Sequence, residues 1–193
     1  MDMSFKSYIH IQTPYQVSEN ISYTANTGYC VFAYDAYRQR AGIARQGAQV
    51  DVLIMPEFER EASSHIWIVE VKDFRKLSKH PNPKNLEKLH VSLERKFEDS
   101  HHWMISLECP EMLRQLYNQA EKWNFCVHVE LPSKKEADKK SPDLYPTFIS
   151  VLRGLIENQF RFPTPNNSPL VILNIKSINN KFVFPWTCQG EMV

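Results

Sequence analysis

The apolar stretch 66–74 holds a glutamate and a lysine two positions apart. Residues two apart on a β-strand project from the same face, so Glu70 and Lys72 are expected to point the same way. A second apolar run at 50–57 contains one carboxylate, Asp51. The loop between the two runs is short enough for a hairpin that would bring Asp51 beside Glu70.

These three residue types suggest a chemistry when they share a face. Two carboxylates alone in a dry site repel each other, and each resists ionising. A divalent cation relieves both problems, because Mg²⁺ takes oxygen ligands from one or two carboxylates and keeps the rest of its shell for water and phosphate. Lys72 could then hold a metal-bound water or a phosphate oxygen on the same face. We therefore expect Mg²⁺ (or Mn²⁺) to bind here.

Asp51 followed by Glu70-Val71-Lys72 resembles the active site of the PD-(D/E)xK nuclease superfamily. That superfamily joins restriction endonucleases, Holliday-junction resolvases and RecB-type nuclease domains. The resemblance covers roughly residues 15–131 and implies an α/β fold with a restriction-endonuclease-like core, a mixed central sheet flanked by helices. It implies that Asp51, Glu70 and the Val71 carbonyl are metal ligands and that Lys72 is the catalytic lysine. The implied activity is metal-dependent hydrolysis of phosphodiester bonds, with DNA as the expected substrate, by a metal-bound water.

Two departures from the family pattern concern the first ligand and a further carboxylate. Val50 stands where the family name has its proline. The carboxylate that the family often carries on its first helix could be Glu19, if residues 14–26 form a short helix. The segment 29–38 has the aromatic and β-branched composition of a strand, and Asp35 is the fallback candidate if residues 32–37 are helical instead. The number of bound metals stays open.

The acid-x-lysine spacing occurs three times in the chain, and its context favours only the first. Glu94 and Lys96 lie on a predicted helix, where positions two apart diverge by about 200°. Asp138 and Lys140 lie in a charged connector. The alternative interpretation of the first pair is a solvated strand end, where such ion pairs contribute little.

The elements that must position these side chains alternate between strands and helices. In chain order we expect a strand at 50–57, a strand at 66–74, a long amphipathic helix at 84–106, a second helix after Cys109-Pro110-Glu111, and a strand at 125–132. Apolar residues recur at helical spacing in the two helices and alternate in the last strand. Strands separated by helices predict a mixed α/β fold with a partly parallel sheet.

The rest of the chain is expected to form an accessory part at about 145–188 of one domain of 193 residues. A charged connector at 133–143 leads to a predicted third helix at 145–160. The runs 169–178 and 181–186 then resemble a hairpin joined at Asn179 and Asn180. His128 and Glu130 share the polar face of the 125–132 strand and could reach the site if that strand adjoins 66–74.

Basic residues after the motif favour nucleic acid as the partner, most simply DNA. The net charge is only +1, so any such affinity must come from local clusters. The candidate phosphate contacts are Lys76, Lys79, Lys84 and Lys88. A core of this size leaves little room for a recognition domain, so a homodimer or a partner subunit is expected to supply specificity. The alternative function is a non-catalytic, nuclease-fold interaction subunit of a DNA-processing or defence complex.

Composition and targeting signals favour a cytoplasmic protein. No run approaches the roughly 18 apolar residues of a membrane helix, and the N-terminal stretch lacks the layout of a signal peptide. The four cysteines are scattered without a C-x-x-C pair, which indicates reduced, buried thiols. His101 and His102 are adjacent, so on a helix they diverge by about 100° and are poor co-ligands for a metal.

Overall fold

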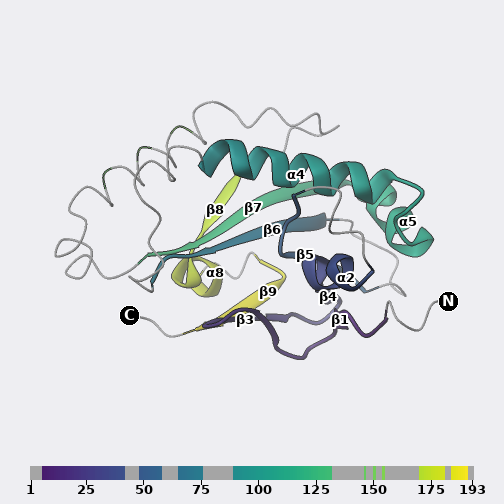
Figure 1. The fold of residues 1–193 in the computed structure, drawn as a ribbon. Helices are drawn as coiled ribbons and strands as arrows, with labels where there is room; N and C mark the ends of the chain where they lie inside the picture. Colours follow the sequence, from purple (N-terminus) through teal and green to yellow (C-terminus); the bar gives the residue numbers. More distant parts are fainter. Residues whose placement is uncertain are drawn as a thin grey trace.

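The computed structural model describes residues 6–41, 48–57, 65–75, 89–131, 170–180 and 184–190, and the single positions Pro146, Ser150 and Gly154. Among these residues the strands form two sheets (Figure 1). The main sheet has the order β1 (Ile9–His10), β4 (Tyr29–Phe32), β5 (Val52–Pro56), β6 (His65–Asp73), β7 (Lys122–Glu130) and β8 (Val171–Leu173). The second sheet has the order β2 (Tyr15–Ser18), β3 (Ile21–Ala25) and β9 (Trp186–Gly190).

The main sheet is mixed. Its neighbours β1–β4, β4–β5 and β5–β6 are antiparallel, whereas β6–β7 and β7–β8 are parallel. The parallel β6–β7 pair needs a crossover, and the helices α4 (Leu89–Ile105) and α5 (Glu111–Gln119) lie on that connection. The predicted mixed α/β fold with a partly parallel sheet is confirmed, as is the order strand, strand, long helix, second helix, strand.

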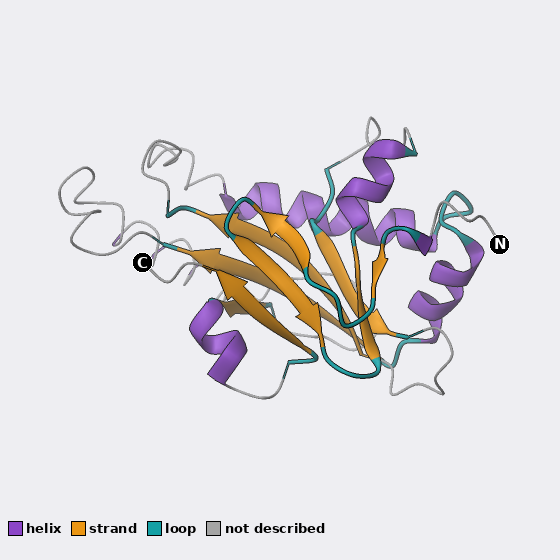
Figure 2. Ribbon diagram, turned by 90° about the horizontal axis from the view of Figure 1, so that it is seen from below, coloured by secondary structure: helices purple, strands orange, loops and turns teal. Residues whose placement is uncertain are grey.

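Both faces of the main sheet are buried, each in its own core. On one face, Ile66 and Ile68 of β6 pack with Leu93 and Phe97 of α4. On the other face, Trp67 of β6 packs with the second sheet and with α8 (Ile175–Asn180). In Figure 1, α4 runs along the top of the sheet, with β3, β9 and α8 below it; in the view from below (Figure 2), the strands lie in front of this helix. A sheet covered on both sides explains the nearly continuous apolar character of β5 and β6.

The N-terminal region differs from the expectation. Residues 14–26 are not a helix but the antiparallel pair β2–β3, because alternate residues of β3 are fully buried and a strand places these on one face. The predicted strand 29–38 is correct only to Phe32, and α2 (Tyr34–Arg40) follows. An aspartate in the first turn of α2 and arginines in its last turn suit the helix dipole.

The predicted C-terminal hairpin is wrong. β8 joins the main sheet beside β7, whereas β9 pairs with β3 in the second sheet. Between them, α8 begins after Asn174. The side-chain oxygen of Asn174 accepts a hydrogen bond from the Ser177 N–H (2.8 Å), and Ser177 Oγ accepts one from the Asn174 N–H (2.7 Å). This reciprocal capping turns the asparagine into a helix start and ends the strand.

Several expectations concern residues outside the described part of the chain. They are the connector 133–143, the helix 145–160 apart from three single positions, and the first residues, 84–88, of the long helix. No helix in the described part of the chain is long and apolar enough to cross a membrane.

The four cysteines are buried and free, as expected. Burial raises the pKa of the Cys30, Cys109 and Cys188 thiols to about 12.

Candidate active site

Asp51 lies immediately before β5, directly opposite Glu70 on β6. The antiparallel register pairs Val52 with Val69, and the Asp51 N–H donates to the Val69 carbonyl at 3.2 Å. The side chain of Asp51 reaches across to β6, where its Oδ2 accepts a hydrogen bond from the Val71 N–H at 2.6 Å. The structure therefore brings the predicted aspartate and glutamate to neighbouring positions on two paired strands.

Glu70 is the buried centre of the arrangement, with no exposed surface. Its Oε1 accepts from two ammonium groups, Lys72 Nζ at 2.5 Å and Lys96 Nζ at 2.6 Å. Its Oε2 is buried and has no hydrogen-bond partner among the residues that the structure describes. Leaving a buried carboxylate oxygen unpaired costs free energy, so this oxygen is an available ligand position.

The electrostatics of Asp51 are those of an acid that is hard to ionise. Burial, and then the charge of Glu70, raise the pKa of Asp51 from 3.8 to about 7, against the opposing effects of Lys96, the Val71 N–H and Lys72. Burial lowers the pKa of Lys96, but Glu70 and Asp51 outweigh it and raise that pKa overall. Both shifts indicate acids and ammonium groups close together in poorly solvated surroundings.

These residues fit a hard divalent cation. The cation would find carboxylate oxygens on Asp51 and Glu70, including the unpartnered Oε2, and its charge would favour ionised Asp51. No group of three or more His, Cys, Asp and Glu residues in the described part of the chain is arranged to hold a metal. Water and phosphate would therefore supply much of the coordination, as Mg²⁺ prefers.

Two helices fix the segment that carries Asp51. Ser100 of α4 accepts a hydrogen bond from the Val50 N–H through its Oγ at 3.1 Å. The Asp35 N–H of α2 donates to the Asp51 carbonyl at 3.1 Å, and the Asp35 carboxylate accepts a hydrogen bond from the Gln49 side chain. Asp51 is thus held from both sides before the strand begins.

Of the two candidates for a further carboxylate, Asp35 is the one on a helix next to Asp51. Its charge also contributes to the raised pKa of Lys96. Glu19 lies exposed in the turn between β2 and β3, which belong to the second sheet. The condition set for Asp35, a helical 32–37 segment, is met from Tyr34 onward, because α2 covers Tyr34–Arg40.

Lys96 is the site residue that the motif analysis missed. The spacing argument correctly predicted that Glu94 and Lys96 do not act as a pair, since Glu94 is exposed. Lys96, however, extends from α4 to Glu70 without Glu94. The signal was present in the sequence, because Lys96 lies three and seven residues after Leu93 and Leu89, in the buried row of the helix. A lysine in such a row needs a partner on the sheet beneath.

The other basic candidates cannot be placed. Lys76, Lys79, Lys84 and Lys88 lie outside the described residues, as do Asp138 and Lys140.

His128 and Glu130 lie on the opposite face from the site, although β7 does adjoin β6. The parallel register pairs Glu70 with Val127 and Val71 with His128, so His128 follows Val71 to the other side. There His128 is fully buried between the Tyr23 hydroxyl and Glu130, to which its Nε2 lies at 2.7 Å. These residues form a second polar network rather than part of the site.

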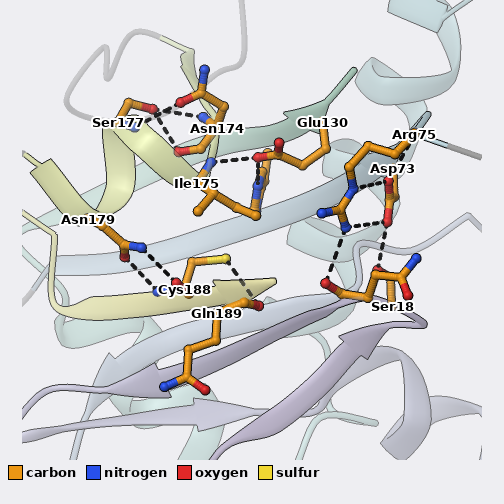
Figure 3. Close-up of polar contacts among 12 residues, drawn as sticks. Ser18, Asp73, Arg75, Glu130, Asn174, Ile175, Ser177, Asn179, Cys188 and Gln189 are labelled. Atoms are coloured by element: carbon orange, nitrogen blue, oxygen red, sulfur yellow. Dashed lines mark hydrogen bonds and ion pairs between the residues drawn. The ribbon is translucent and has the colours of Figure 1, made fainter. Parts of the chain in front are cut away.

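Figure 3 shows the part of this network that involves Glu130, together with the contacts of Asp73 and Arg75 at the end of β6. Glu130 accepts a hydrogen bond from the Ile175 N–H at 2.5 Å, which ties α8 to β7. Arg75 pairs with Asp73 through two hydrogen bonds of 2.7 and 2.8 Å, and donates to the Asn20 carbonyl at 3.2 Å. The network joins the two sheets directly behind the strand end from which Lys72 projects.

No protein-family model, curated protein or solved structure matches this chain.

Proposed function

We propose that this protein is a divalent-metal-dependent nuclease that hydrolyses phosphodiester bonds, with DNA as its substrate. The observation that carries the proposal is the convergence of Asp51, Glu70 and Lys72 on one sheet face, where Oε2 of Glu70 has no hydrogen-bond partner within the described part of the chain. The order of the elements supports it. Three antiparallel strands, β4 to β6, lead through α4 to the parallel strand β7, as a restriction-endonuclease-like core of the PD-(D/E)xK type requires.

The residues have separate roles in this proposal. Asp51 and Glu70 would hold Mg²⁺ or Mn²⁺, with the Val71 carbonyl as a third ligand. When bound, the cation would supply Lewis-acid polarisation of a phosphate oxygen and a lowered pKa for water. Lys72 orients the attacking water or the phosphate and exchanges a proton with it. Buried Glu70 and the contacts of the Asp51 segment keep the two acids in position before substrate arrives, which reduces the reorganisation needed for catalysis.

A second candidate function has one observation in its favour. The two ammonium groups on Glu70 already neutralise the buried acids without a metal. A nuclease-fold subunit that had lost catalysis, and that binds nucleic acid or partner chains in a larger complex, would gain stability from such pairing.

The test is plasmid nicking in Mg²⁺ or Mn²⁺. We compare wild type with Asp51→Asn and Lys72→Ala, and use Lys176→Ala, an exposed lysine on α8, as the matched control. Removing a group that stabilises the transition state costs about 10²–10³-fold in rate. We expect such losses in the two site variants and none in the control. Unchanged cutting by Asp51→Asn refutes the proposal, and a wild type that binds DNA without cutting it favours the second candidate.

A further inference from the structure

Lys96 lies on the side of α4 that is otherwise occupied by buried residues. The residues of α4 that are buried against the main sheet are Leu89, Leu93, Phe97, Ser100 and Met104. Lys96 projects from the same side of the helix, and its side chain retains only 23% of its exposure. Ordering and desolvating a lysine costs free energy, both in rotamer entropy and in lost hydration.

Pairing with Glu70 does not by itself account for this lysine. Lys72 already neutralises Glu70 at 2.5 Å, and Lys96 reaches the same oxygen, Oε1, at 2.6 Å. Two ammonium groups on one carboxylate oxygen repel each other, so the second adds less stability than the first. The site therefore holds one more cation than Glu70 requires.

A count of the charges in the site with metal and substrate bound suggests a role for the second ammonium group. Two ionised acids and a divalent cation cancel, which leaves the charges of Lys72 and Lys96 uncompensated in a poorly solvated pocket. A phosphodiester group carries one negative charge, and negative charge on its oxygens grows as hydrolysis proceeds. One ammonium group matches the charge of the bound phosphodiester, and a second one matches the charge that develops as hydrolysis proceeds.

We propose that Lys96 is a substrate-binding residue whose ammonium group pairs with a non-bridging oxygen of the phosphodiester once the metal engages Glu70. This inference rests on the proposed nuclease function and adds a division of labour to it. Lys72, on the sheet, orients the attacking water. Lys96, on α4, binds the phosphate.

The experiment compares Lys96→Gln and Lys96→Arg with the control Arg95→Gln. Arg95 is adjacent on the same helix and carries the same charge, but its side chain is 73% exposed and its ion pair with Asp99 is long, at 3.7 Å. The readout is the affinity of each protein for a short labelled DNA duplex, measured by fluorescence anisotropy in Ca²⁺ at several salt concentrations. Mn²⁺ affinity without DNA is measured by calorimetry, and folding by thermal melting.

We expect Lys96→Gln to weaken duplex binding about tenfold and to lower the salt slope by about 1, as loss of one phosphate contact does. Lys96→Arg should keep most of the affinity, and Arg95→Gln should match wild type. Mn²⁺ should bind Lys96→Gln as tightly as wild type or more tightly, because a competitor for Glu70 is gone.

Three outcomes overturn the inference. The inference fails if Lys96→Gln binds duplex with wild-type affinity and salt slope. It also fails if this variant loses Mn²⁺ affinity or does not fold, because either result makes Lys96 a structural support for Glu70. If wild type cuts DNA in these cases, the proposed function stands without this inference. If wild type neither binds Mn²⁺ nor cuts DNA, both fall together.

Discussion

Asp51→Asn should stabilise the metal-free protein at neutral pH while abolishing its activity. The substitution removes a charge that the fold resists, and the asparagine side-chain oxygen can still accept the Val71 N–H bond. Burial and the neighbouring Glu70 raise the pKa of Asp51 from 3.8 in its ordinary state to about 7 in the folded protein. The folded state thus holds this proton more tightly than the unfolded chain does.

The sign and size of the effect follow from linkage. A carboxyl whose pKa rises on folding makes wild type progressively less stable as the pH increases from about 4 to about 7, with no further change above that. The two values, 3.8 and about 7, correspond to at most ~4 kcal/mol at 1.36 kcal/mol per pH unit. If relaxation halves this, ~2 kcal/mol raises the melting temperature of a chain of this size by about 4–8 °C.

The assay is thermal melting in EDTA across pH 4 to 8, for wild type and Asp51→Asn, with Asp73→Asn as the control of opposite sign. Burial raises the pKa of Asp73, but hydrogen bonds from Arg75 outweigh it and lower that pKa. Asp73→Asn should therefore destabilise the protein at pH 8 and have less effect in acid. Saturating Mn²⁺ should stabilise wild type, by ~2.7 kcal/mol at a hundred times the dissociation constant, and leave Asp51→Asn unchanged. An Asp51→Asn protein that melts below wild type at pH 8 in EDTA, or a difference that does not vary with pH, refutes the reasoning.

Three further predictions concern other parts of the molecule. Glu70→Gln leaves Lys72 and Lys96 without their carboxylate, so we expect a loss near the lower end of ~3–5 kcal/mol in urea unfolding, since both lysines keep some exposure. A smaller loss than that of Lys96→Gln alone would contradict the pairing. Tyr23→Phe removes the hydroxyl partner of His128 and should lower the free energy of unfolding by ~1–3 kcal/mol. It should not change plasmid nicking, because the pair lies on the opposite face, and reduced nicking by folded protein would contradict this. The buried thiols with pKa values raised to about 12 should react with a chromogenic disulfide reagent only on unfolding, and rapid reaction of the native protein would count against their burial.

The strands that hold the predicted acids could be inferred from the sequence because their signals are local. Alternation in 66–74 assigned Glu70 and Lys72 to one face, and the same alternation divides Ile66 and Ile68 from Trp67 between the two cores. The position of Asp51 opposite Glu70 followed from a short loop and antiparallel pairing. Period and loop length suffice for such neighbours.

The features that the sequence did not reveal depend on contacts between distant segments. Lys96 meets Glu70 only because α4 crosses above β6, and a two-residue spacing rule carries no information on that crossing. The pairing of β9 with β3 joins residues more than 160 positions apart, where a nearer hairpin partner was the simpler choice. The sequence left open whether the strand of His128 adjoins β6. It does, but the parallel register turns His128 to the opposite face.

The pairing of β9 with β3 also orders events during synthesis on the ribosome. β3 leaves the ribosome early, yet the strand that covers its open edge is translated only after β4 to β8 have appeared. Until then the β2–β3 pair presents unsatisfied backbone groups and the apolar side chains of Ile21 and Tyr23 to solvent or to chaperones. A nascent chain stalled before Trp186 would expose this edge. Such a stalled chain is therefore a predicted substrate for holdase chaperones and for quality-control proteases.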